Sequence, residues 1–216
     1  MNKNNDDEII RIINFLLKKD KKLSTILNTE IYCPIFNKPR LNNKDLFRNL
    51  SRSIVGQQLA NKVANGIWKK LNQKIKNSNQ FLKQMNKINI SKAKKFGISK
   101  AKLEYIKDIS LKVESKKFSF TKVAKLNNND AINKLMELRG VGSWTAEMFL
   151  IFELKRKDIF SFKDAGLKRA MAYLYDDNDL TDKKIERIVK KWTPYKSIVC
   201  WYLWKALDEG ILKKNG

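Results

Sequence analysis

The chain has 216 residues, enough for one substantial core or two small lobes, and its 43% hydrophobic and 10% aromatic content excludes global disorder. Its 46 Lys and Arg against 22 Asp and Glu give a formal charge of +24, which favours a polyanionic partner. There is no His, and Cys33 and Cys200 lie far apart. His-based nucleophile pairs, His-ligated zinc and Cys-ligated zinc or iron–sulfur sites are therefore excluded, and we expect no cofactor.

Helical periodicity recurs along the whole chain, which has only eight Gly and three Pro. The first apolar stripe falls at helical spacing on Ile9, Ile12, Ile13, Leu16 and Leu17. Further helices are predicted at about 43–54, beyond residue 56 with Leu59, Val63, Ile67 and Leu71 on one face, and at 100–113, 129–138, 143–154, 165–174, 182–192 and 195–209. Because we find no fixed repeat and no long linker, the pattern predicts an all-α fold in a single domain, residues 1–216.

Two features predict where the protein acts. The longest apolar run, Ile198 to Trp204, has seven residues, against the roughly 20 that a membrane-spanning helix needs, so no membrane partner is expected. The segment from Met1 to Glu8 lacks the apolar stretch of a secretory signal. We therefore expect a protein of the cytoplasm, associated with the nucleoid, or of the nucleus.

The positive charge has two explanations. Of the 46 basic residues 38 are Lys, a bias that an AT-rich genome gives to any protein. The alternative is attraction to nucleic-acid phosphates, and Lys83 to Lys125 holds 13 Lys against three acids. Lys suits diffuse phosphate contact better than the reading of base edges, so the balance favours backbone binding.

The most informative stretch is Leu138 to Ala146, between two predicted helices. Gly140 and Gly142, separated by one Val, can form a very tight turn between helices, because Gly tolerates positive φ and lets a partner approach the backbone. The helix that follows would present free N–H groups and its positive dipole end to an anion. A DNA phosphate fits such a site, although an ordinary Gly-capped turn has the same two glycines.

The segment from Leu138 to Ala146 resembles the helix-hairpin-helix of the DNA base-excision glycosylases. Three more blocks follow in the order of that family: Ser53 to Leu59, Gly97 to Ile106, and the C-terminal block Trp192 to Trp204. The resemblance covers about residues 45–205 and is closest to the 3-methyladenine DNA glycosylase II branch of the HhH-GPD superfamily. It implies the compact form of that branch, without an N-terminal sheet domain.

The resemblance assigns candidate site residues. Asp164, about 20 residues past the hairpin, matches the catalytic carboxylate of the family; taken alone, it is also an N-cap candidate for the helix at Ala165, and both roles can coexist. Trp144 and Trp204 match aromatic walls of the base pocket; the alternative for Trp204 is a core residue, because Trp201 and Trp204 lie three residues apart on an apolar helix. Met148 occupies a pocket position where some relatives have an aromatic residue, so the choice of base stays open.

The DNA contacts follow from the same resemblance. Gly140, Gly142 and Thr145 would hold a phosphate, and Gln58 matches the residue that fills the gap left by a flipped nucleotide. A helix-capping role for Gln58 is the alternative. Relatives also hold a monovalent cation on hairpin carbonyls, which in this chain correspond to Met136, Leu138 and Val141.

Trp144 bears on the reaction type. Bifunctional members of the superfamily have at this position a Lys that attacks the sugar. The resemblance thus implies a monofunctional glycosylase, a monomer without AP lyase activity, that hydrolyses the N-glycosidic bond of alkylated purines in duplex DNA and leaves an abasic site. The alternatives are a non-enzymatic helix-hairpin-helix module that binds DNA, or a glycosylase for oxidised or mismatched bases.

The implied architecture has two helical lobes. One covers about residues 50–156, with the helix-hairpin-helix at about 130–154. The other joins about 1–49 to 157–216.

Overall fold

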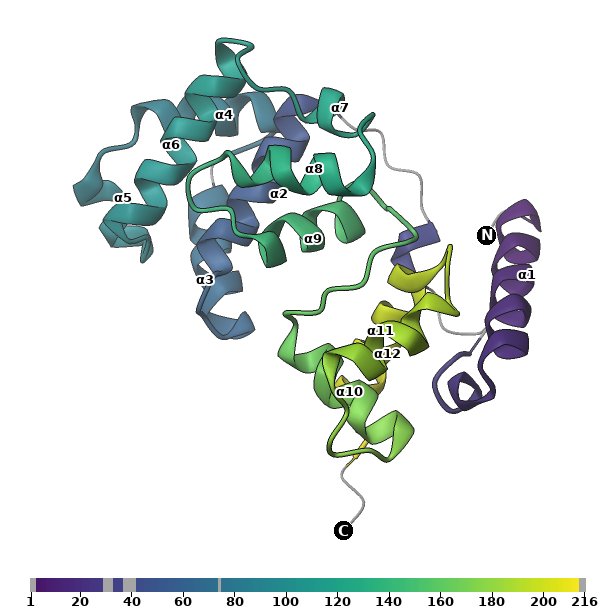
Figure 1. The fold of residues 1–216 in the computed structure, drawn as a ribbon. Helices are drawn as coiled ribbons and strands as arrows, with labels where there is room; N and C mark the ends of the chain where they lie inside the picture. Colours follow the sequence, from purple (N-terminus) through teal and green to yellow (C-terminus); the bar gives the residue numbers. More distant parts are fainter. Residues whose placement is uncertain (1–2, 29–32, 37–41, 74, 214–216) are drawn as a thin grey trace. The chain divides into compact units, whose positions relative to one another are not determined.

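The computed structural model describes residues 3–28, 33–36, 42–73 and 75–213, which form helices and connecting turns with no strand (Figure 1). The all-α prediction is confirmed. The helices are α1 Lys3–Lys19, α2 Asn43–Gly56, α3 Asn61–Asn72, α4 Ser78–Lys87, α5 Ile90–Phe96, α6 Lys100–Glu114, α7 Phe120–Val123, α8 Asn128–Met136, α9 Ser143–Phe152, α10 Ala165–Tyr175, α11 Asp182–Lys190 and α12 Lys196–Asp208, with 3-10 turns η1 Lys21–Thr25 and η2 Pro34–Phe36. None of the helices in the described ranges is long and apolar enough to cross a membrane.

The chain divides into two compact units. One consists of residues 1–38 and 150–216, and the other of residues 39–149. The predicted lobe boundaries at 50 and 156 differ from these. Residue 50 lies inside α2, which is one continuous helix. Residues 150–156 belong to the unit that contains the C-terminal segment, and within that unit Phe152 packs on Trp204 with ring centroids 5.5 Å apart.

Helix α2 forms the centre of the 39–149 unit and packs against α3, α4, α6 and α7. Its apolar stripe, Leu46, Phe47, Leu50 and Ile54, is completely buried. This stripe follows the helical period, so burial of one face fixes the helix on its neighbours. The carboxyl end of α2 is thereby held at a defined place in the unit.

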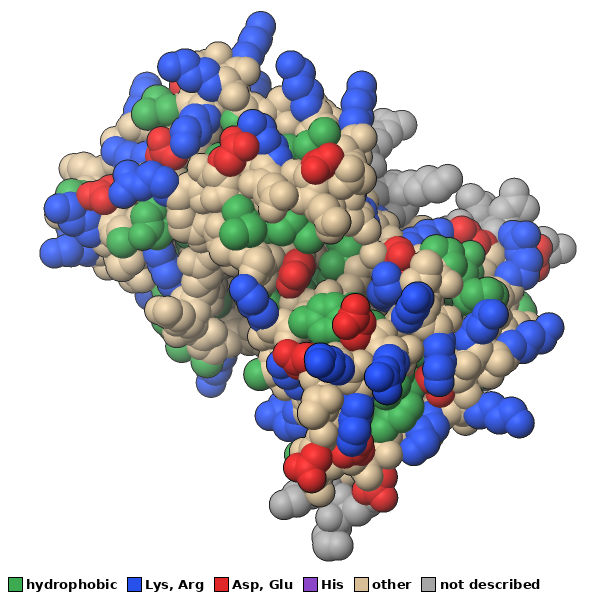
Figure 2. Space-filling view, in the orientation of Figure 1, with side chains coloured by type: hydrophobic (Ala, Val, Ile, Leu, Met, Phe, Trp, Pro, Cys, Tyr) green, Lys and Arg blue, Asp and Glu red, His purple; other side chains and the backbone are tan. Residues whose placement is uncertain are grey.

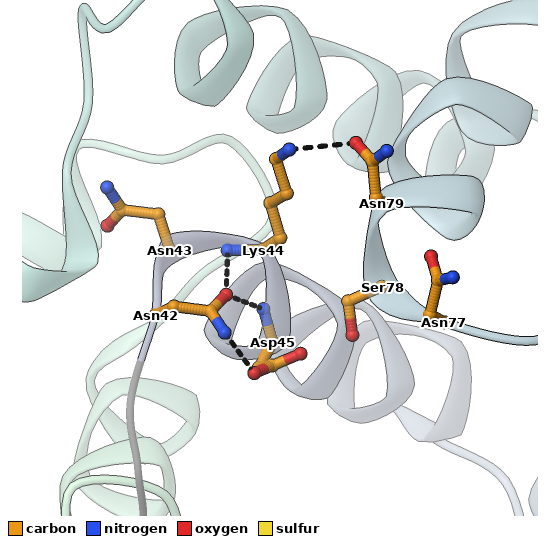
Figure 3. Close-up of a pocket in the computed structure, with 7 residues that line it drawn as sticks. All are labelled: Asn42, Asn43, Lys44, Asp45, Asn77, Ser78 and Asn79. Carbon is orange, nitrogen blue, oxygen red and sulfur yellow. Dashed lines mark hydrogen bonds between the residues drawn. The ribbon is translucent and has the colours of Figure 1, made fainter.

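A polar hollow of about 540 Å³ lies where α2 and α4 begin (Figure 3). Asn42 accepts N–H bonds from Lys44 and Asp45, each at 3.0 Å, and Asn77 accepts one from Gln80 at 3.0 Å. These Asn side chains satisfy helix amides that an anion would otherwise bind. The Asn side chains that line this hollow therefore stabilise the first turns of α2 and α4.

The predicted stripe from Leu59 to Leu71 is partly wrong. Helix α3 begins only at Asn61, and Val63 is 51% exposed. Of the four residues predicted to share one face of this helix, only Leu71 is buried, Ile67 is half-buried, and Leu59 lies before the helix begins. Apolar spacing alone does not reveal which part of a stripe is covered.

The other unit has a buried polar centre. Asp20, 8% exposed, caps η1 and accepts hydrogen bonds from the Tyr175 hydroxyl and, at 3.2 Å, from the Trp192 indole N–H. Burial, together with the bond to Asp20 and its charge, raises the pKa of Tyr175 above its usual range. Asp20 thus joins the N-terminal segment to α10 and to the end of α11.

Replacing Asp20 by Ala is expected to lower the free energy of unfolding by about 2–4 kcal/mol, because it leaves the buried Trp192 indole N–H and the part-buried Tyr175 hydroxyl without an acceptor. For a chain of this size that corresponds to a loss of roughly 4–16 °C in Tm, measured by thermal unfolding. The exposed Asp179, whose side chain makes no hydrogen bond or ion pair among the described residues, provides the control Asp179→Ala. Equal Tm values for the two variants would contradict the argument.

Basic side chains are spread over both units on the face drawn in Figure 2, with acidic and hydrophobic side chains between them. Several lysines pair with nearby carboxylates, as in Lys112 with Asp108 at 2.8 Å and Lys205 with Glu209 at 2.5 Å. The charge excess on this face is therefore diffuse. Such a distribution suits non-specific attraction to a polyanion better than the reading of a sequence.

Candidate active site

The predicted helix-hairpin-helix is present as α8, a turn and α9. Asn127 is the N-cap of α8, since its side chain accepts the Asp130 N–H at 2.9 Å. In the turn, Leu138 and Val141 are buried, and the Val141 N–H donates to the Leu138 carbonyl at 3.1 Å. The middle residue of Gly-Val-Gly therefore fixes the turn to the core.

The two glycines of the turn have different roles. Gly140 has φ +82°, and a Cβ at this position would lie only 2.2 Å from Cδ2 of Tyr105. Gly142 has no positive φ, a Cβ added to it would meet nothing within 4 Å, and its carbonyl accepts the Ala146 N–H at 3.0 Å in the first turn of α9. Gly140 is thus required by conformation and packing, whereas Gly142 leaves the start of α9 open to an anion.

Thr145 is buried, with 4% of its surface exposed. Its hydroxyl accepts a hydrogen bond from Nε2 of Gln57 at 3.2 Å. The observed role of Thr145 is therefore to join the hairpin to the end of α2. Its contact with a phosphate stays a prediction.

Gln58 lies in the turn between α2 and α3. It is exposed and has φ +57°, in the left-handed region that non-glycine residues rarely adopt. The capping position of α2 belongs to Gln57, so the alternative of a helix cap does not apply to Gln58. Insertion of Gln58 into DNA stays a prediction, for which an exposed side chain on a strained turn is suitable.

Two residues outside the predicted set hold this turn. The Gln57 side-chain amide donates to the Gly140 carbonyl at 2.9 Å as well as to Thr145. The Lys102 ammonium donates to the carbonyls of Val55 and Gln57 at 2.9 and 2.7 Å, and burial lowers the pKa of Lys102. Both residues lie inside blocks that resemble the family, but no local pattern identifies their partners 45 and 83 residues away.

Trp144 and Met148 lie on α9 one helical turn apart, on one face of the helix. Trp144 is 42% exposed, which is unusual for a Trp whose only role is packing in the core, and Met148 is half-buried. This exposure is compatible with the predicted role of both side chains in lining a base pocket, which stays a prediction. Both belong to the same unit as the hairpin.

Asp164 caps α10 in the other unit. Its Oδ1 accepts the Leu167 N–H at 2.8 Å, so the structural role expected for this Asp is confirmed. The same oxygen accepts the indole N–H of Trp204, on α12, at 3.1 Å. A Cβ at Gly166 would lie 3.1 Å from this oxygen, so the small residue leaves room for the carboxylate.

Trp204 is half-buried and packs against Phe152, so it is not a simple core residue. The structure therefore brings together Asp164 and Trp204, two of the predicted site residues, in one hydrogen-bonded pair. The rings of Phe152, Trp201 and Trp204 line a surface pocket of about 520 Å³.

The proposed cation ligands are the carbonyls of Met136, Leu138 and Val141. Met136 is the last residue of α8, and Leu138 and Val141 belong to the turn. The Leu138 carbonyl accepts one N–H bond, which leaves its second lone pair for a cation. The donor type therefore fits a monovalent cation, and the site stays a prediction.

Comparison with known proteins agrees with this geometry. Residues 51–195 match the family described as HhH-GPD superfamily base excision DNA repair protein. DNA-3-methyladenine glycosylase 1 of Schizosaccharomyces pombe is 28% identical over 170 residues, which cover 77% of this chain and 74% of that protein.

Solved structures show the same similarity. DNA-3-methyladenine glycosidase from Bacillus halodurans superimposes with a TM-score of 0.74 at 33% identity, over 90% of this chain and 88% of the other. The 3-methyladenine DNA glycosylase Mag1 of Schizosaccharomyces pombe, in complex with abasic DNA, has a TM-score of 0.71 at 24% identity, over 90% and 93% of the two chains. This chain belongs to the HhH-GPD superfamily of base excision DNA repair proteins.

Proposed function

We propose that this DNA glycosylase hydrolyses the N-glycosidic bond of alkylated purines, of the 3-methyladenine and 7-methylguanine type, in duplex DNA and leaves an abasic site. The observation that supports it most directly is the Asp164 carboxylate, held by Leu167 and Trp204. The names of the relatives, which are 3-methyladenine glycosylases, support the class of base.

The chemistry assigned to Asp164 is electrostatic. Cleavage of a glycosidic bond passes through an oxocarbenium-like state, in which positive charge develops on the sugar. A carboxylate fixed near the sugar stabilises that charge, or activates the water that attacks it. The cap bond from Leu167 and the indole bond from Trp204 hold Oδ1 in one position before the substrate arrives, so no reorganisation is needed in the reaction.

The absence of His is compatible with this class of substrate. An alkylated purine such as 7-methylguanine is already a cation, so it leaves without being protonated by the enzyme. The face of an aromatic ring attracts such a cation by about 0.5–2 kcal/mol. We assign this role to Trp144 and Trp204, with Met148 as a polarizable neighbour that adapts its shape to the base.

The proposal includes a monofunctional reaction. The position of the Schiff-base Lys of bifunctional relatives is Trp144, and an indole cannot attack the sugar. We therefore expect no strand cleavage and no covalent intermediate. We further propose that the protein acts as a monomer, in the cytoplasm with its nucleoid or in the nucleus, where such DNA lies.

The test is the release of bases from DNA treated with a methylating agent, with detection of free bases by chromatography and mass spectrometry. The expected result is release of 3-methyladenine and 7-methylguanine without strand breaks, and no trapping by borohydride. A protein that releases 8-oxoguanine or mismatched adenine instead, or that binds the duplex and releases nothing, would overturn the proposed substrate class.

Replacing Trp204 by Phe is expected to slow base release roughly tenfold, because hydrogen bonds to charged groups contribute about 1.5–3 kcal/mol and this one is only partly buried. Phe keeps a ring against Phe152 but has no N–H for Asp164. The rate is measured in single turnovers with methylated DNA. The control is Trp68→Phe, a half-buried Trp of the other unit whose ring packs on Phe81; equal rates in the two variants would argue against a role of the indole N–H.

A further inference from the structure

The turn that carries Gln58 needs external support. A non-glycine residue at φ +57° is strained, and the last carbonyls of α2 have no partner within the helix. Two other segments bind the turn. The hairpin binds the side chain of Gln57, and α6 binds backbone carbonyls at the end of α2. Both bonding arrangements lie within the 39–149 unit.

The first support is the side chain of Gln57. One amide group donates to both the Gly140 carbonyl and the Thr145 hydroxyl, at 2.9 and 3.2 Å. Gly140 lies in the turn of the hairpin and Thr145 in the first turn of α9. The residue directly before Gln58 is thus tied to both sides of the proposed phosphate site.

The second support comes from α6. Lys102 donates to the Val55 and Gln57 carbonyls, and Tyr105, three residues further along the same face of α6, fills the space beside Gly140. The Arg139 guanidinium lies over the Tyr105 ring, 5.6 Å from its centre. One face of α6 therefore contacts the end of α2 and the hairpin at once.

We propose that Gln57 is a positioning residue that fixes the Gln58 turn relative to the hairpin, so that binding of a phosphate and insertion of Gln58 occur in one register. This inference rests on the proposed function, because insertion matters only if a nucleotide leaves the stack. Gln57 itself contacts neither the base nor the sugar in this role. It acts through its bonds to Gly140 and Thr145.

The test compares Gln57→Met, which keeps the length of the side chain and removes its N–H donors, with Gln73→Met as control. Gln73 is an exposed Gln in the same unit with no side-chain hydrogen bond among the described residues. The duplex holds 2-aminopurine beside an uncleavable abasic analogue, so a side chain that enters the gap changes the fluorescence without any excision. The Gln58→Ala variant gives the 2-aminopurine fluorescence that is expected when no side chain enters the gap.

For Gln57→Met we expect the fluorescence change at saturation to fall below half of that in Gln73→Met. We also expect base release to slow roughly tenfold to a hundredfold, the effect of a small misplacement, while affinity for undamaged duplex follows the control. A fluorescence change like that of the control, or an affinity for undamaged duplex that falls as much as the rate, would overturn the proposal.

Lys102→Met removes the other support of the turn and is expected to reduce the fluorescence change in the same way. With this second variant, the test still gives a result if Gln57→Met does not fold. If the wild type released no base, the proposed function would fail. The fluorescence comparison would still decide the role of Gln57, because it needs no chemistry.

Discussion

Replacing Asp164 by Asn is expected to lower the single-turnover rate of base release about a thousandfold. At an effective dielectric near 20, opposite charges about 4 Å apart interact by roughly 4 kcal/mol, and the neutral amide loses this stabilisation of the oxocarbenium-like state. The rate is measured with saturating enzyme on DNA that contains 7-methylguanine. Binding to the same DNA is followed separately, so that loss of affinity is not mistaken for loss of chemistry.

The fold should survive this change, since Asn is about as good an N-cap as Asp and can still accept the Leu167 N–H. A control with the same loss of charge is Asp179→Asn, at an exposed position in the same unit. We expect the control to release base at the wild-type rate, and both variants to keep the wild-type Tm within a few degrees. A wild-type rate in Asp164→Asn would remove this carboxylate from the mechanism.

Local sequence patterns predict most of the helices. Helix α11 begins at Asp182 with Thr181 as its cap, as expected from a hydroxyl before an apolar helical run. Helix α4 is not among the predicted helices, although Asn77 caps it and Phe81, Leu82 and Met85 are buried, because polar residues surround this short apolar group. Patterns of this kind are clear in long helices and weak in short ones.

Within the candidate site, sequence identifies the residues whose role is local. The cap at Asp164 and the positive φ of Gly140 follow from neighbours in the chain. Gln57 and Lys102 could not be found in this way, because their partners are backbone carbonyls brought close by the fold. Every residue has a backbone carbonyl, so the sequence does not show which carbonyl a distant side chain binds.

The same limit applies to burial. Val63 and Leu71 are both apolar and lie on one helix, yet the first is exposed and the second is buried. From sequence, a core role for Trp204 stays open beside the pocket-wall prediction, because its hydrogen bond to Asp164 exists only once α10 and α12 pack together. Tertiary contacts, which spacing does not encode, decide such cases.

Replacing Gly140 by Ala is expected to lower the free energy of unfolding by about 2–4 kcal/mol, which corresponds to roughly 4–16 °C in Tm. A Cβ at Gly140 would lie 2.2 Å from the ring of Tyr105, and a shift of that ring would break its contact with Arg139. In addition, the φ of Gly140 is +82°, which strains any residue with a Cβ. Because the first amides of α9 move with the turn, affinity for duplex DNA should also fall, by roughly tenfold for each 1.4 kcal/mol of phosphate binding lost.

Gly142→Ala separates these two effects. The added Cβ would meet nothing within 4 Å and the φ of Gly142 is not positive, so Tm should stay close to that of the wild type. The added methyl group would nevertheless stand where a phosphate approaches the start of α9, so affinity for duplex DNA should fall without loss of stability. Thermal unfolding and fluorescence anisotropy with the same two variants measure both quantities. If Gly142→Ala bound DNA as the wild type does, the phosphate would not approach over this glycine, and the open face beside it would have no part in binding.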